Sequence, residues 1–252
     1  MSLTITVLGS SGSYPGRGRA CSGYLVQGGG KNVWLDAGSG TMANLQKHIA
    51  LADIDAVVIS HEHPDHWSDI NGLQVACSYG NGPDRVAVYA PATLCEFAYR
   101  FNKSPLDWKV ITDGSEVSIG GQNWRFSRSD HPPETLAARV EADGAAFGYT
   151  ADTGTDWSAA KLGPELDLLL SEATFQDKDA EEVAAEGTHV GHLSARQAGE
   201  MARACGIPRL VITHLWPTHD PEVSRRQAEE GFGGGVEVAN EGDQFAVASV
   251  RG

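Results

Sequence analysis

The chain has 252 residues, of which 41% are hydrophobic and 21% are charged, a composition that supports a folded core and argues against disorder. It contains no run of about 18 apolar residues, so no membrane span is predicted. The net charge of −14 disfavours a long nucleic acid as the main partner, because a negative surface repels phosphates, although bound divalent cations would weaken that repulsion locally.

Apolar and alternating runs predict an α/β chain of twelve strands and six helices. In chain order, the strands are expected at Thr4–Leu8, Gly23–Gln27, Asn32–Leu35, Ala56–Ser60, Arg85–Tyr89, Glu116–Ile119, Trp124–Ser127, Ala138–Glu141, Ala146–Thr150, Leu166–Leu170, Leu210–Thr213 and Gln244–Val247. The helices are expected at Thr41–Ala50, Pro64–Cys77, Ala92–Phe101, Asp156–Lys161, Ser194–Ala204 and Pro221–Gly231. No linker or repeat divides the chain, so residues 1–252 are expected to form one domain.

Six apolar runs end in residues that can bind a metal ion or transfer a proton. These residues are Asp36, His61, His131, Asp152, Glu172 and His214. Open α/β sheets carry their sites beyond the carboxyl ends of the strands, so the six side chains are predicted to converge on one site.

The most specific motif is His61-Glu-His63-Pro-Asp65-His66. Residues i and i+2 of an extended segment project to the same side, so His61 and His63 can hold one ion together. Pro64 suits the first turn of a helix, and the change of direction lets Asp65 and His66 face a second ion. Packed this closely, polar groups need partners, and metal coordination supplies them.

This motif resembles the signature of the metallo-β-lactamase-fold hydrolases, and the later strand-end motifs follow in the same order. The resemblance implies a four-layer αββα sandwich, in which two mixed β-sheets are flanked by helices. It implies one ion held by His61, His63 and His131, and a second held by Asp65, His66 and His214. Asp152 would bridge the two ions, and Asp36 would support the ligands. The all-histidine and carboxylate donors favour two Zn²⁺ ions, with Mn²⁺ or Fe as chemical alternatives.

Two further segments resemble loops of the ribonuclease Z-like phosphodiesterases, namely Ser171-Glu-Ala-Thr-Phe175 and Gly191-His-Leu-Ser194. The resemblance implies that His192 protonates the leaving oxygen and that Glu172 orients the His192 ring. Asp65 is also expected to be a catalytic residue. The opening Leu8-Gly-Ser-Ser-Gly-Ser-Tyr-Pro15 also resembles the first loop of that branch. The glycines of this segment would let backbone amides approach a phosphate near Arg17 or Arg19. An ordinary Gly/Ser turn after the first strand explains the same segment equally well.

Ribonuclease Z enzymes carry a long tRNA-binding arm, commonly between the third-histidine and bridging-aspartate motifs. Only 21 positions separate His131 from Asp152, which leaves no room for it. We therefore expect a phosphodiesterase for small or cyclic nucleotide phosphodiesters, acting through a metal-bridging hydroxide. The alternatives are a tRNA 3′-processing endoribonuclease, a lactone, ester or thioester hydrolase, and a non-catalytic metal-binding protein.

The remaining expectations concern location and assembly. The first residues lack the basic start of an export signal, and the four cysteines form no C-x-x-C pair, so a cytoplasmic protein with reduced thiols is expected. Related enzymes are often dimers, which makes a homodimer one expectation. His48 and His189 are expected at the surface or at helix ends, and His219 in a loop.

Overall fold

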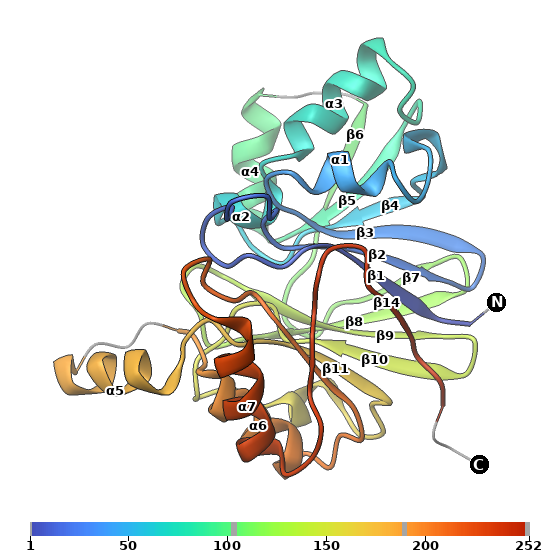
Figure 1. Cartoon of the computed structure of the whole chain (residues 1–252). Coiled ribbons are helices and arrows are strands. Elements are labelled where there is room, and N and C mark those ends of the chain that lie inside the picture. Colours follow the sequence, from blue (N-terminus) through green and yellow to red (C-terminus); the bar gives the residue numbers. More distant parts are fainter. Residues whose placement is uncertain (1, 102–104, 188–190, 250–252) are drawn as a thin grey trace.

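The computed structural model describes residues 2–249 except 102–104 and 188–190, and it contains two seven-stranded sheets (Figure 1). The first sheet has the order β14-β1-β2-β3-β4-β5-β6, with β1 at Thr4–Gly9, β2 at Gly23–Gly28, β3 at Lys31–Ala37, β4 at Ala56–Val58, β5 at Val86–Ala90, β6 at Leu106–Val110 and β14 at Gln244–Ala246. The second has the order β13-β12-β11-β10-β9-β8-β7, with β7 at Glu116–Ile119, β8 at Gln122–Arg128, β9 at Leu136–Ala142, β10 at Ala145–Tyr149, β11 at Leu168–Glu172, β12 at Leu210–Thr213 and β13 at Glu237–Val238.

Both sheets are mixed. In the first sheet, β14 to β3 pair antiparallel and β3 to β6 pair parallel. In the second, β7 to β10 pair antiparallel and β10 to β13 pair parallel. Parallel neighbours need crossover connections, and these connections contain the helices.

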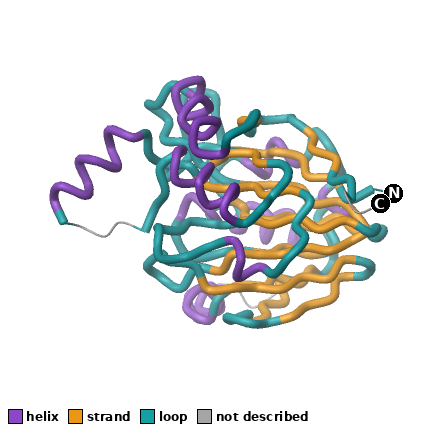
Figure 2. The backbone as a smooth tube through the Cα atoms, turned by 90° about the horizontal axis from the view of Figure 1, so that it is seen from below, coloured by secondary structure: helices purple, strands orange, loops and turns teal. Residues whose placement is uncertain are grey.

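The helices cover the outer faces of the sheets, with the exception of α5 (Figures 1 and 2). The crossovers of the first sheet contain α1 (Thr41–Leu45), the 3₁₀ turn η1 (Leu51–Asp53), α2 (Pro64–Trp67), α3 (Ile70–Tyr79) and α4 (Ala92–Phe101). Those of the second contain the 3₁₀ turn η2 (Ala159–Leu162), α5 (Asp177–Glu186), α6 (Ala195–Ala204) and α7 (Pro221–Phe232). In both views α5 extends away from the body of the molecule.

Three apolar clusters lie between the four layers. Alternate residues of a strand face opposite sides, so Val33 and Leu35 of β3 join the core between the sheets, while Trp34 packs under the helices of the first sheet. The third cluster lies between the second sheet and the side chains of η2, α6 and α7. The predicted αββα sandwich is confirmed. Among the described residues, no helix is long and apolar enough to cross a membrane.

Several predicted elements were wrong in detail. The helix expected over Pro64–Cys77 is two helices, because the Asp69 amide donates to the carbonyl of Ala37 instead of continuing α2. The helix expected over Thr41–Ala50 ends at Leu45, and that over Asp156–Lys161 is reduced to η2. Four elements were not predicted. They are the 3₁₀ turn η1, the edge strands β6 and β13, and α5, which has no buried residue.

The strand ends meet at one edge of the sandwich, where the chain turns sharply. Asp36, Ala151 and His214 each have a φ between 50° and 56°, a left-handed conformation that residues other than glycine rarely adopt. Each stands at or within two residues of a strand end. Unfavourable backbone conformations of this kind persist where surrounding contacts hold them, and they concentrate at functional sites.

Candidate metal centre

One group of four side chains brings its metal-binding atoms together at this edge. It consists of His61, His63, His131 and Asp152, whose nitrogen and oxygen atoms lie within 4.8 Å of one another. His61 and His63 follow β4, and His63 has the extended backbone that places alternate residues on one side. His131 follows β8 and Asp152 follows β10, so both sheets contribute to the group.

Asp65, His66 and His214 form a second group within the same distance. Asp65 and His66 belong to α2, which starts with Pro64, where the missing amide proton has no cost. His214 directly follows β12, and its Nε2 lies 3.2 Å from Asp65 Oδ2 and 3.3 Å from His66 Nε2.

Asp152 lies between the two groups and turns one oxygen toward each. Its Oδ2 is 3.6 Å from His61 Nε2 and 3.8 Å from His131 Nε2. Its Oδ1 is 3.4 Å from the Nε2 atoms of His66 and His214. This is the arrangement expected of a carboxylate shared by two neighbouring cation sites.

The contacts within the cluster fit divalent cations better than a closed hydrogen-bond network. His61 Nε2 and Asp152 Oδ1 are buried and have no hydrogen-bond partner among the described residues. His131 Nε2 faces His63 Nδ1 at 3.1 Å, a distance at which two imidazole nitrogens need one proton or one cation between them. Buried polar groups left unpaired are costly, and imidazole nitrogens and carboxylate oxygens are ligands that suit Zn²⁺ and related metals.

Neighbouring groups fix the orientation of four of the five imidazoles through Nδ1. These contacts are His61 with Ser60 Oγ at 3.0 Å, His66 with Asp36 Oδ2 at 2.7 Å, His131 with the Gly191 carbonyl at 2.8 Å and His214 with Thr174 Oγ1 at 2.9 Å. Holding Nδ1 leaves Nε2 as the metal-binding nitrogen. Asp36 was predicted for such a role. Ser60, Thr174 and Gly191 were not, although each lies in or beside a predicted motif.

Burial and neighbouring charged groups shift the pKa values of residues in the cluster. Burial lowers the pKa of His61 well below its usual value, and the neighbouring His66 adds to this shift, so His61 is a neutral, ligand-competent imidazole. Burial opposes ionisation of Asp65, but the neighbouring His66 and His214 outweigh it and hold the pKa of Asp65 well below the usual range. Asp65 is therefore a carboxylate, the form that binds cations.

Glu172 and His192 form a hydrogen-bonded pair beside this cluster. His192 Nδ1 lies 3.0 Å from Glu172 Oε1, and the His192 ring stacks on His214 with 5.7 Å between ring centroids. One nitrogen of His192 is within 4.8 Å of the metal-binding atoms of Asp152 and His214. Burial opposes the charged imidazolium, but Glu172 outweighs it and raises the pKa of His192 to about 9.

The two segments that carry this pair are held together by their backbones. Phe175 and Ser194 form a parallel β-bridge, with Phe175 N donating to Leu193 O and Ala195 N donating to Phe175 O. The Glu172 carboxylate also accepts from Thr153 N at 2.7 Å and from Thr174 Oγ1 at 2.6 Å. Glu172 thus links the Asp152 loop, the Thr174 contact with His214, and His192.

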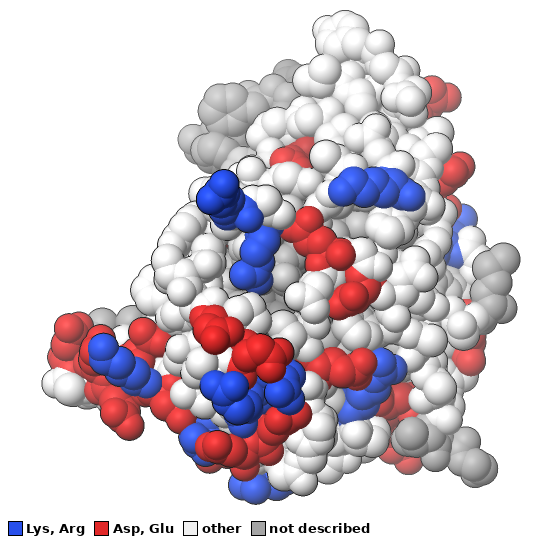
Figure 3. All heavy atoms as spheres, in the orientation of Figure 1, with Lys and Arg blue, Asp and Glu red and all other residues white. Residues whose placement is uncertain are grey.

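The loop between β1 and β2 closes one side of the cluster. Ser13 N donates to Asp65 Oδ2 at 2.8 Å, and Gly12 lies so close to His214 that an added Cβ would stand 2.8 Å from its Nδ1. The glycine is therefore required by close approach to His214. Arg17 and Arg19 follow in the same loop, over which Lys and Arg side chains are visible in Figure 3, whereas Asp and Glu side chains gather over α5.

His48 and His219 take no part in this cluster. His219 Nε2 lies 3.3 Å from Asp179 Oδ2 of α5, and its ring packs on Trp216 with 5.6 Å between centroids. His48 is half-buried in the turn after α1, and His189 lies outside the described residues. Trp216 in turn packs on Phe175, which contacts the His192 ring, so aromatic side chains line this side of the centre.

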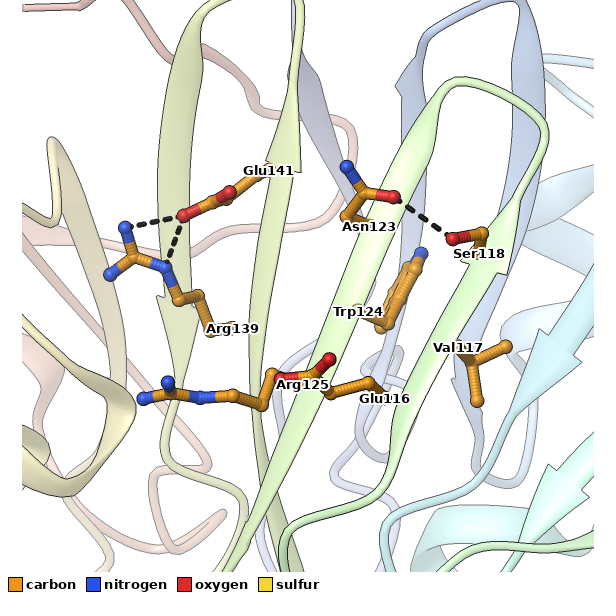
Figure 4. Close-up of a pocket in the computed structure, with 8 residues that line it drawn as sticks. All are labelled: Glu116, Val117, Ser118, Asn123, Trp124, Arg125, Arg139 and Glu141. Carbon is orange, nitrogen blue, oxygen red and sulfur yellow. Dashed lines mark hydrogen bonds and ion pairs between the residues drawn. The ribbon is translucent and has the colours of Figure 1, made fainter.

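A separate pocket of about 300 Å³ lies over β7, β8 and β9 (Figure 4). Arg139 pairs there with Glu141 at 2.6 Å and also donates to the Pro164 carbonyl at 2.7 Å. None of the residues that line the pocket belongs to the histidine–aspartate cluster. Both arginines of this pocket, Arg125 and Arg139, donate to protein acceptors.

Comparison with known proteins agrees with this geometry. The family model described as "Beta-lactamase superfamily domain" matches residues 4–215. The chain is 32% identical to the "probable metallo-hydrolase YhfI" of Bacillus subtilis over 95% of this chain and 98% of the relative. It is 28% identical to a ribonuclease Z of Streptomyces coelicolor, over 94% of this chain and 95% of that protein.

The fold agrees as well. The crystal structure of the metallo-β-lactamase fold protein YhfI from Bacillus subtilis superimposes with a TM-score of 0.87 and 28% identity, over 97% of this chain and all of that one. The extent of the family match and the 32% identity show that this chain belongs to the β-lactamase superfamily and is a metal-dependent hydrolase of that family.

Proposed function

We propose that this protein is a phosphodiesterase that uses two divalent cations, Zn²⁺ foremost, to hydrolyse small or cyclic nucleotide phosphodiesters. His61, His63 and His131 would hold one cation, Asp65, His66 and His214 the other, and Asp152 would contact both. The observation that carries the proposal is the Glu172–His192 pair beside this cluster. A bond whose leaving oxygen needs a proton gains from such a pair.

Bound divalent cations would lower the pKa of water and neutralise charge on phosphoryl oxygens. His192 donates the proton to the departing oxygen, because Glu172 occupies its Nδ1 and leaves Nε2 as the donor. Glu172 keeps the ring charged and fixes its direction, and the hydrogen bonds of Glu172 with Thr153 and Thr174 hold Glu172 in turn. Asp65 would bind its cation while the Ser13 amide holds the same carboxylate in place.

Substrate size is inferred from the segment between His131 and Asp152. It contains only β9 and β10, joined by a tight turn at Asp143-Gly144, where both residues have positive φ. The ribonuclease Z relative aligns over 290 positions, more than the 252 residues of this chain, so it has segments that this chain lacks. A compact site on a chain with net charge −14 favours small phosphodiesters over tRNA.

Ribonuclease Z activity is the second candidate, because the identity of 28% to such an enzyme extends over 94% of this chain. Purified, Zn²⁺-loaded protein would be assayed with bis(p-nitrophenyl) phosphate, 2′,3′- and 3′,5′-cyclic nucleotides, a pre-tRNA, and lactone and thioester substrates. Turnover of the small phosphodiesters with little pre-tRNA cleavage is expected. Efficient pre-tRNA cleavage would favour the second candidate, and inactivity toward every phosphodiester would reject both.

A further inference from the structure

We propose that Tyr149 is a positioning residue for the cation site of Asp65, His66 and His214, and that it acts through its hydrogen bond to Asp36. The inference rests on the proposed cation sites, but it concerns a residue that contacts neither cation nor substrate. Its consequence is a specific one: removing a single hydroxyl in the core should weaken one cation site and spare the other.

The first step is the state of His66. Its Nε2 faces the Nε2 of His214 at 3.3 Å and Asp65 Oδ2 at 3.4 Å, so this nitrogen is the one available to a cation. The proton must then be on Nδ1, which lies 2.7 Å from Asp36 Oδ2. Asp36 thereby sets both the tautomer and the direction of the His66 ring.

The second step is what holds Asp36, whose carboxylate is fully buried. Ser60 provides two donors, its amide at 2.7 Å from Oδ1 and its hydroxyl at 2.9 Å from Oδ2. Tyr149 OH donates to the same Oδ2 at 2.8 Å. A buried carboxylate depends on such donors, so losing one of them alters the acceptor that His66 uses.

The third step is the position of Tyr149 in the fold. Asp36 and Ser60 belong to the first sheet or its connections, whereas Tyr149 ends β10 of the second. The same strand end leads through Ala151, with its φ of 50°, to Asp152. One segment therefore supplies the carboxylate between the two cation sites and the hydroxyl that fixes Asp36. Burial and the nearby Asp36 raise the pKa of Tyr149 well above its ordinary value, so the hydroxyl keeps its proton.

Tyr24 provides a matched control. It is as buried as Tyr149, and the two rings lie 5.3 Å apart, but its hydroxyl bonds to Thr213 Oγ1 at 2.7 Å and, within the described part of the chain, makes no hydrogen bond to Asp36. Y149F and Y24F thus each delete one hydroxyl from the same part of the core. Only the first deletion removes a donor from Asp36.

The experiment is a Zn²⁺ titration of the metal-free full chain in competition with a chromophoric chelator. H61A and H66A assign the two binding steps, since each lacks a ligand of one site. Y149F should weaken the His66 step about 10- to 100-fold and change the His61 step by less than about threefold. Y24F should leave both steps unchanged, while thermal unfolding reports whether both variants are folded.

An unchanged His66 step in Y149F, an equal loss at both sites, or the same loss in Y24F would overturn the proposal. If Y149F does not fold, D36N decides the question, because Tyr149 is proposed to act only through Asp36. D36N should show the same selective loss, and normal affinity in it would reject the proposal. Wild-type protein that binds no Zn²⁺ would reject the cation sites themselves, which separates that failure from this one.

Discussion

Each histidine of the cluster uses its two ring nitrogens for different purposes. In His66, His131 and His214 the Nδ1 atom is held by a carboxylate, a carbonyl or a hydroxyl, and Nε2 faces the other metal-binding atoms. His63 is reversed, since its Nδ1 faces His131. Because a neutral imidazole carries only one N–H, the partner of one nitrogen decides what the other can bind.

His192 is the residue on which the proposed chemistry depends most. H192A should lower kcat on cyclic nucleotides by about 10²- to 10⁴-fold, because it removes the proton donor for the leaving oxygen. Steady-state kinetics and elemental analysis of the same sample provide the measurement. Metal content should remain at the wild-type value, and a loss of metal would instead make His192 a ligand. H48A, which changes a histidine outside the cluster, is the control.

Gly12 is required for a steric reason. In G12A the new Cβ would lie 2.6 Å from the His214 carbonyl oxygen and 2.8 Å from its Nδ1, both too close for an ordinary contact. We expect a loss of about 1–3 kcal/mol in the free energy of unfolding, as in other overpacked sites, together with weaker Zn²⁺ binding. Denaturant unfolding and Zn²⁺ titration would measure these effects. G235A should behave as wild type, since no atom of the described residues lies within 4 Å of the added group.

At the scale of elements, the strand ends could be predicted because short apolar runs stop at His, Asp or Glu. The hexapeptide from His61 to His66 also predicts the turn into α2, since Pro64 and the spacing of the ligands are local features. The pairing of Phe175 with Ser194 could not be predicted, because it joins residues on either side of α5 through backbone hydrogen bonds. Helix α5 buries no residue, and Val183 is its only large apolar residue, so its sequence gives little sign of a core-facing helix.

The start of α6 gives a test at this scale. Ser194 Oγ accepts from Gln197 N, and the Gln197 side chain accepts from Ser194 N at 2.8 Å, which satisfies two amides of the first turn. S194A should lower the free energy of unfolding by about 1 kcal/mol and the Tm by about 2–4 °C, as measured by calorimetry. S118A, at an exposed position of β7, should change Tm little. Equal shifts in the two variants would argue against the capping contribution.

At the scale of the whole molecule, the site exists because the two sheets pack against each other. The first sheet and its helices bring His61, His63, Asp65 and His66, and the second brings His131, Asp152 and His214. The order of the motifs along the chain predicted these seven residues. It predicted even His131, whose neighbouring residues form no specific motif. The contacts of Tyr149 and Thr174 could not be predicted, because a hydroxyl finds its partner only when strand register and sheet packing are known.

Because the proposed ligands come from both sheets, we expect bound cations to stabilise the whole fold. Cations that bind the folded chain alone, at about 100 times their Kd, would add about 3 kcal/mol, or about 6–12 °C in Tm for a domain of this size. Calorimetry of the protein as purified, after chelation and after return of Zn²⁺ should show that loss and its recovery. The H61A/H214A double variant lacks one ligand of each proposed site, so its Tm should respond far less. A wild-type Tm that chelator and Zn²⁺ leave unchanged would mean that the histidine–aspartate cluster does not hold cations between the sheets.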